Sequence, residues 1–126
     1  MGSMPRISDS EWEVMKAVWK AGKPLSSDEI ISLLAYKEWH PKTVRTLINR
    51  LVKKGALSCK KDGRAYSYAP AVGEKECIME ESQTLLDKLF GGSLAPMLAN
   101  FVEGKRLGKQ DIAELEEILR KSSKEG

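Results

Sequence analysis

The stretch HPKTVRTLINRLVKKG, residues 40–55, combines an aliphatic face with a cationic one. Four aliphatic residues recur at the i, i+3, i+4 and i+7 spacing that is typical of the buried face of a helix: Val44, Leu47, Ile48 and Leu51. Pro41 suits the first helical position, because its missing N–H costs nothing there, and Gly55 suits the residue just after the end. The outer side is cationic and hydrogen-bonding, and the stretch contains no acid. It therefore predicts a helix that packs on one side and offers donors to a partner on the other.

Positive charge is concentrated in and just after this predicted helix. Residues 42–64 contain eight cations and one acid, a net charge of +7, whereas the whole chain carries +3. Residues 4–41 carry −1 and residues 73–126 carry −3. A compact positive segment of this kind is the electrostatic footprint of a phosphate-binding surface.

Two capping boxes predict helices before this stretch. Ser8-Asp-Ser-Glu11 begins a helix over about 9–21, which Gly22 ends. Ser26-Ser-Asp-Glu29 begins a second helix, which fades near Tyr36. Three aliphatic residues of this second helix are expected to face inward: Ile30, Leu33 and Leu34.

After the cationic helix the periodicity changes to that of strands. The segment ALSCKKDGRAYSYAP, residues 56–70, alternates in hydrophobicity, and its Lys61-Asp-Gly-Arg64 supplies turn residues for a hairpin. Residues 8–70 therefore predict helix, helix, helix and hairpin. Two helices before a basic third helix form a helix-turn-helix, and the hairpin forms a wing.

The remaining chain predicts three short, one-sided helices, over residues 74–90, from Leu94 onward, and over 111–122. About fifty residues rarely build a stable core alone, so these apolar stripes need a cover. A second copy of the chain is the simplest cover, because isologous dimers are the commonest assembly. The expected dimer contacts are Leu85, Leu89, Leu94, Leu98, Phe101, Val102, Ile112, Leu115, Ile118 and Leu119.

The fold class that follows is mainly α with a small β-hairpin. A winged helix-turn-helix domain is expected over residues 4–72, and a C-terminal three-helix dimerisation domain over residues 73–126. Residues 1–3 are interpreted as a cloning remnant ahead of Met4.

The cationic helix and the wing together predict DNA binding. A recognition helix contacts bases mostly through its N-terminal residues, whereas cations elsewhere meet phosphates. The expected base-reading residues are Lys42, Thr43, Arg45 and Thr46, with a phosphate contact as the alternative for Arg45. The expected phosphate-binding residues are Arg50, Lys53, Lys60, Lys61 and Arg64. Two alternatives stay open, namely a merely solvated basic helix face, and an RNA or acidic protein partner.

Composition argues against an enzyme. The chain has one histidine, no Gly-rich phosphate loop, and two cysteines without metal-ligand spacing, so we expect no catalytic residues, no metal and no cofactor. Cys59 and Cys77 are interpreted as reduced thiols of a cytoplasmic protein. No apolar run approaches the roughly 20 residues of a membrane span, so no direct membrane insertion is expected.

Three segments, ISDSEWEVMKAVW, HPKTVRTLINRLVKKGAL and LANFVEGKRLGKQDIAELEEIL, together with the wing, resemble the penicillinase repressors of the BlaI/MecI family. The resemblance extends over nearly the whole chain. It implies a winged-helix transcriptional repressor that dimerises through its C-terminal helices and binds two-fold symmetric operators. The implied partners are double-stranded operator DNA and a second copy of the chain.

The resemblance also implies a mode of control. In this family a membrane sensor-protease responds to a β-lactam, and the repressor is cut at an Asn-Phe bond in a dimerisation helix, which here would be Asn100-Phe101. Periodicity alone assigns Phe101 to packing, and both roles are compatible. The regulated genes would be β-lactamase or cell-wall-stress genes. The alternatives are a regulator of unrelated genes without cleavage control, and a protein-interaction module that uses the basic helix. The related copper-responsive repressors carry a C-terminal cysteine cluster, which the tail ILRKSSKEG lacks.

Overall fold

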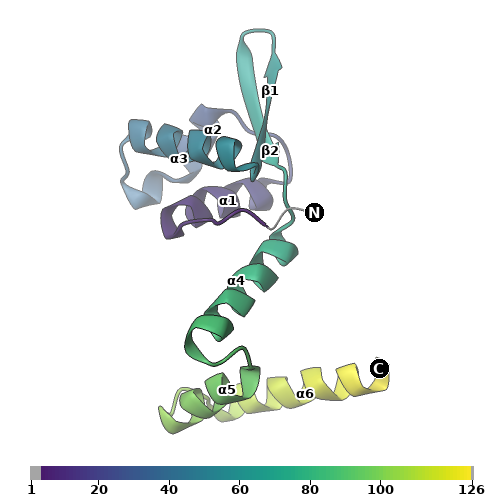
Figure 1. Cartoon of the computed structure of the whole chain (residues 1–126). Coiled ribbons are helices and arrows are strands. Elements are labelled where there is room, and N and C mark those ends of the chain that lie inside the picture. The colour runs from purple at the N-terminus through teal and green to yellow at the C-terminus, as the bar shows by residue number, and fades with distance from the viewer. Residues whose placement is uncertain (1–3, 126) are drawn as a thin grey trace. The chain divides into compact units, whose positions relative to one another are not determined.

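The structure is a computed structural model that describes residues 4–125, with side chains up to residue 124 (Figure 1). Residues 1–3, interpreted as a cloning remnant, and residue 126 lie outside the described part. The chain divides into two compact units, residues 1–80 and 81–126. The elements are α1 (Asp9–Ala21), α2 (Ser27–Leu33), the 3-10 helix η1 (Ala35–Lys37), α3 (Pro41–Lys54), β1 (Leu57–Asp62), β2 (Ala65–Pro70), α4 (Glu74–Leu89), α5 (Leu94–Glu103) and α6 (Lys109–Glu125).

Both predicted capping boxes are present in the first unit. At α1 the Ser8 hydroxyl accepts from the Glu11 N–H at 3.2 Å, and the Glu11 carboxylate accepts from the Ser8 N–H at 2.8 Å. At α2 Ser26 and Glu29 make the same exchange. Each box satisfies two N–H groups that a helix start leaves free. Gly22 ends α1 with a φ of 67°, in the left-handed region that glycine adopts without strain.

Helix α3 begins and ends where its sequence predicted. Pro41 is its first residue, and the Nδ1 atom of His40 accepts from the Lys42 N–H at 3.0 Å, which caps the helix. Gly55 closes it with a φ of 83°. The predicted buried face is confirmed, because Val44, Leu47, Ile48 and Leu51 are all at most 5% exposed.

The predicted hairpin is also confirmed. Strands β1 and β2 pair antiparallel from Leu57 with Pro70 to Asp62 with Ala65, around a turn with a φ of 66° at Gly63. On the other edge of β2, Leu25 and Tyr68 exchange two backbone hydrogen bonds of 2.9 and 2.7 Å. The hairpin is therefore tied to the loop between α1 and α2, and its tip extends away from the helices (Figure 1).

The core of the first unit lies between α1, α2, α3 and the base of the hairpin. It includes Met15, Ile30, Leu51 and Leu57, each at most 2% exposed. The Trp19 indole donates to the Val72 carbonyl at 3.0 Å and so attaches the segment after β2 to α1. Further along the chain, the first turn of α4 contributes its buried Cys77 to this same core.

One core prediction is wrong. Ile30 and Leu34 are buried as expected, but the Leu33 side chain is 49% exposed. Leu33 is the last residue of α2, and the neighbouring side chains that α1 contributes, Ala17 and Ala21, are too small to cover it. The exposed Leu33 side chain lies instead beside a cavity described below.

The second unit consists of the later turns of α4 followed by α5 and α6. Helix α6 begins at Lys109, two residues earlier than predicted, where the Asp111 carboxylate accepts from the Gly108 N–H at 3.0 Å. Ser93 occupies the N-cap position of α5, but its side chain makes no capping hydrogen bond. Within residues 81–124 no side chain is buried. No helix in the described part of the chain is long and apolar enough to cross a membrane.

Candidate nucleic-acid interface

The outer face of α3 is uniformly polar and accessible. Opposite its four buried aliphatic side chains lie residues that are all exposed: Lys42, Thr43, Arg45, Thr46, Asn49, Arg50 and Lys53. The first turn of α3 contains no acid, so the positive end of the helix dipole is not neutralised there. This face can donate hydrogen bonds to base edges and can attract phosphates.

Thr46 is held in one orientation on this face. Its hydroxyl donates to the Lys42 carbonyl one turn earlier, at 3.0 Å. With the proton used in this way, the hydroxyl oxygen remains available as an acceptor, and the methyl group points away from the backbone bond. Thr46 therefore offers an acceptor and an apolar methyl to a groove, rather than a donor.

Arg45 is restrained by a residue that the sequence reasoning did not single out. A guanidinium nitrogen of Arg45 lies 3.2 Å from a carboxylate oxygen of Asp28, in the first turn of α2. Both side chains are exposed, at 52% and 84%, so the pair contributes little to folding stability. It nevertheless links the two helices of the helix-turn-helix across the outer surface. The sequence feature that could have indicated this pair is Asp28, the acid inside the second capping box.

The two adjacent lysines at the end of α3 differ. Lys53 is exposed, as expected of a phosphate contact. The Lys54 ammonium instead turns inward, 2.5 Å from the buried Glu11 carboxylate and 2.8 Å from the Arg6 carbonyl. Burial alone would raise the pKa of Glu11, but hydrogen bonds from Lys54 and Ser8 outweigh it and lower that pKa. Lys54 therefore belongs to the structure of the unit and not to its outer face.

The wing carries the three other cations that were expected to meet phosphate. Lys60, Lys61 and Arg64 are all exposed, with Arg64 in the turn. Consecutive strand residues point to opposite faces, so Lys61 shares the face of Leu57 and Lys60 lies on the other. The Lys61 ammonium lies 5.8 Å from the centre of the Tyr66 ring, on the paired strand. Only one of the two lysines can therefore point to the same side as α3.

The residues expected at a dimer contact are all accessible in the single chain. The most exposed are Leu119 at 64%, Ile118 at 61% and Leu89 and Val102 at 58%. Ile112, Leu85 and Leu94 are between 44% and 51% exposed. Leu98 and Leu115 are partly buried. The structure thus leaves the predicted apolar stripes of the second unit without a cover.

Asn100 and Phe101 lie in the later half of α5, and both are exposed. The Asn100 carbonyl accepts a hydrogen bond from the Gly104 N–H at 3.0 Å. The Phe101 carbonyl accepts one from the Arg106 N–H, just after the end of α5, at 2.8 Å. The peptide bond between Asn100 and Phe101 therefore lies in the hydrogen-bonded part of α5, close to its C-terminal end.

Cys59 and Cys77 are free cysteines, the first exposed and the second buried. Burial raises the pKa of the Cys77 thiol above its ordinary value. Within residues 4–125 no cluster of three or more His, Cys, Asp or Glu side chains could hold a metal ion.

Comparison with known proteins identifies relatives over almost the whole chain. The profile of the penicillinase repressor family matches residues 7–121. The penicillinase repressor of Bacillus licheniformis is 40% identical over 119 residues, covering 94% of this chain and 93% of that protein. The methicillin resistance regulatory protein MecI of Staphylococcus aureus strain N315 is 37% identical over 115 residues, covering 91% and 94%.

Solved structures of a related repressor match part of the chain. The solution structure of the DNA-binding domain of the repressor BlaI aligns with a TM-score of 0.53 at 43% identity, covering 60% of this chain and 93% of that one. The Bacillus licheniformis BlaI monomer in complex with the blaP half-operator aligns with a TM-score of 0.52, at the same identity and coverage. These likenesses extend over most of the length of the chain and of its relatives. The chain therefore belongs to the penicillinase repressor family, whose members are winged-helix DNA-binding repressors and not enzymes.

Proposed function

We propose that the chain acts as a homodimeric transcriptional repressor, which binds a palindromic operator and blocks transcription. The observation that carries the proposal is the outer face of α3, which is exposed, free of acids and backed by a fully buried aliphatic face. The solved complex of a related repressor with its half-operator supports DNA as the ligand of this unit. A repressor of this kind works in the cytoplasm, in contact with the chromosome.

In this proposal α3 enters the major groove with its N-terminal half. Lys42, Thr43, Arg45 and Thr46 read base edges, and the salt-dependent part of the affinity comes from cations on phosphate. Those cations are Arg50, Lys53, Lys60, Lys61 and Arg64. Lys60 and Lys61 point to opposite faces of the wing. Whichever of these two lysines lies on the same side as α3 makes the stronger phosphate contact.

The second unit supplies the second half-site. Two copies that cover one another's apolar stripes would hold two α3 helices at a fixed spacing, so that binding of the first raises the effective concentration of the second. The support for this step is the exposure of the aliphatic side chains of α5 and α6, together with the lack of any buried side chain within residues 81–124. A palindromic operator matches such a two-fold assembly.

Induction in this proposal is proteolytic. Cleavage between Asn100 and Phe101 would separate α6 and the end of α5 from the rest of the chain. The dimer contact would lose Phe101, Val102 and four aliphatic residues of α6. A monomer retains one half-site, so occupancy of the operator falls. The protease would be a membrane sensor, and the genes those of β-lactamase or cell-wall stress. The names of the relatives, penicillinase repressor and methicillin resistance regulatory protein, support a link to β-lactam resistance genes.

The decisive experiment on DNA binding is a competition between the operator and random duplex. A specific site should outcompete random DNA by at least about a thousandfold. Thr46→Ala should change the base preference, whereas Arg50→Ala should weaken binding to all sequences alike and reduce the salt slope by about one. Equal affinity for both duplexes would contradict the proposal, and an unchanged preference profile for Thr46→Ala would contradict the placement of α3.

The proteolytic step needs its own measurement. Mass spectrometry of the repressor recovered from β-lactam-treated cells should show a fragment that ends at Asn100. Substitution of Phe101 with Gly should leave operator binding by the first unit intact while it changes the cleavage. Release of repression with the chain intact would indicate a regulator without cleavage control.

A further inference from the structure

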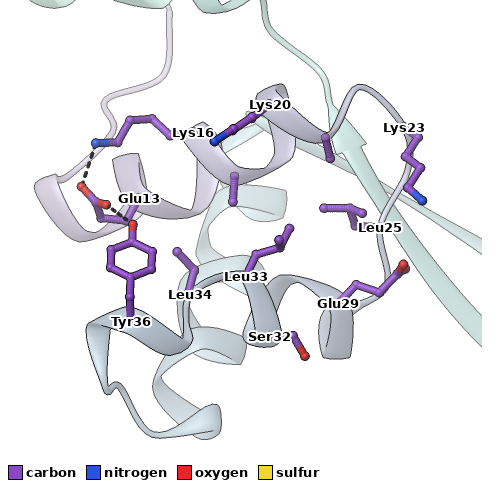
Figure 2. A pocket seen from close by; sticks show the side chains of 12 residues that line it. Glu13, Lys16, Lys20, Lys23, Leu25, Glu29, Ser32, Leu33, Leu34 and Tyr36 are labelled. Carbon is purple, nitrogen blue, oxygen red and sulfur yellow. Dashed lines mark hydrogen bonds and ion pairs between the residues drawn. The ribbon is translucent and has the colours of Figure 1, made fainter.

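A cavity of about 700 Å³ lies between α1 and α2 in the first unit (Figure 2). Its size is within the roughly 300–1,000 Å³ that small-molecule sites occupy. Its lining residues come from α1, α2, η1 and the loop that joins the two helices, and none of them is a residue of α3 or the wing. The cavity is therefore separate from the DNA-binding face.

The floor of this cavity is apolar. Leu33, whose side chain is 49% exposed, lies in its middle, with Leu25 and Leu34 on either side (Figure 2). The facing part of α1 contributes two small residues, Ala17 and Ala21, which leave the space open. A half-exposed leucine opposite alanines is a surface that an apolar group would cover favourably.

Two contacts within the protein border the cavity. At one end the Tyr36 hydroxyl donates to the Glu13 carboxylate at 2.8 Å, a bond that connects η1 with α1 (Figure 2). At the other end the chain returns from Gly22 to Leu25 and pairs with the hairpin. A long helix lying along the cavity would have to break the Tyr36–Glu13 bond. A short ligand would not.

The cavity is lined by more cations than acids. Glu13 already accepts from Tyr36 and pairs with Lys16 at 3.0 Å. The Glu29 carboxylate accepts from the Ser26 N–H at 2.9 Å. Among the described residues, no hydrogen bond or ion pair engages Lys20 or Lys23, both of which line the cavity. Hydrogen bonds from Ser26 and, to a smaller extent, the charge of Lys23 lower the pKa of Glu29. Lys23 is therefore partly engaged by Glu29, and Lys20 is the cation that remains to receive an anion.

We propose that this cavity binds a small molecule with an apolar body and one anionic group, such as a carboxylate. The apolar body covers Leu33 between α1 and α2, and the anionic group is received by Lys20 and, in competition with Glu29, by Lys23. The Tyr36–Glu13 bond limits the length of the ligand. Charge complementarity favours an anion over a cation or a neutral molecule.

The test uses the full chain labelled with nitrogen-15 and titrated with sodium decanoate below its micelle concentration. Amide shifts should concentrate in residues 13–36 and saturate with a single site. Decyltrimethylammonium, which has the same aliphatic chain with a positive head, should bind at least about tenfold more weakly, because the lysines repel it. Equal binding of the two amphiphiles, or shifts confined to α5 and α6, would overturn the proposal.

Three variants sharpen the assignment. Lys20→Glu combined with Lys23→Glu should weaken decanoate binding about tenfold or more, whereas Lys75→Glu, a matched exposed lysine outside the cavity, should not change it. Leu33→Asp should abolish saturable shifts, because a charge then occupies the apolar floor. These side chains are exposed, so a folded amide spectrum is expected for each variant. A double lysine variant that binds like Lys75→Glu would refute the site.

Discussion

The two units of this chain use the same kind of amphipathic helix in opposite ways. In the first unit the aliphatic stripe of α3 is buried, and Leu51 is 0% exposed. In the second unit the equivalent stripe of α6 is open, with Leu119 at 64%. Spacing is similar in both, so the pattern shows that a helix has an apolar face but does not show what covers it. The difference separates a unit that completes its own core from one that needs another molecule.

The largest expected effect comes from separating the two units. A fragment of residues 4–80 should remain folded and melt cooperatively, because it contains the whole buried cluster. A fragment of residues 81–126 should be largely unfolded when dilute, since short helices without tertiary packing are marginal in water. Circular dichroism across a concentration series checks both statements. A dilute, monomeric 81–126 fragment with full helicity would show that the second unit is stable alone.

The next largest effect should be on assembly. Ile118→Glu combined with Leu119→Glu should weaken dimerisation by at least about 100-fold, because each buried aliphatic side chain contributes about 1.5–3 kcal/mol. Sedimentation equilibrium measures the change. Ala113→Glu, on the opposite side of the same helix, is the matched control and should leave the dimer intact. If the control and the double variant dissociate alike, the stripe of α6 is not the contact.

The sequence predicted what depends on neighbours along the chain. Caps at Ser8, Ser26 and Gly55, the buried face of α3 and the hairpin turn all follow from residues within a few positions of one another. Leu33 was placed wrongly because only the small side chains of Ala17 and Ala21 lie near it on α1, which leaves it half-exposed. Its exposure depends on which side chains of α1 lie beside α2, which a helical period cannot express.

What the sequence could not give were contacts between distant residues. Lys53 and Lys54 are identical neighbours, yet only Lys54 meets Glu11, which is 43 positions away. The pair between Arg45 and Asp28 likewise depends on how α2 lies against α3. The outer face of α3 was predicted correctly as exposed. Which of its residues are already engaged within the protein was visible only in three dimensions.

A smaller effect should distinguish the ion pairs of the two units. Glu11→Gln should lower the free energy of unfolding by about 2 kcal/mol at neutral pH, because it leaves Lys54 without its buried charged acceptor. The pKa of Glu11 is lowered from 4.5, so the wild-type advantage is complete above that pH and is lost as the pH falls through the lowered pKa. Chemical denaturation of both proteins between pH 7 and about pH 3 measures this convergence.

The matched control for this effect is Glu117→Gln in the second unit. Glu117 pairs with Arg120 on the surface of α6, and its side chain is 47% exposed. Water replaces such a partner at little cost, so the free energy of unfolding should stay unchanged. A loss for Glu117→Gln as large as that for Glu11→Gln would remove the distinction between the two pairs.

The smallest expected effect concerns the surface pair on the helix-turn-helix. Asp28→Asn should leave stability unchanged, but it releases Arg45 and removes a negative charge from the first turn of α2. Affinity for random duplex should then rise about threefold, with a slightly steeper salt dependence, because one more cation is free to meet phosphate. Specificity should fall, because Arg45 is no longer held toward one position.

The matched control is Asp87→Asn, which changes the net charge equally but lies in the second unit. It should change neither the affinity for random duplex nor the specificity. Equal effects of both variants in filter binding would mean that Asp28 acts only through net charge and does not position Arg45.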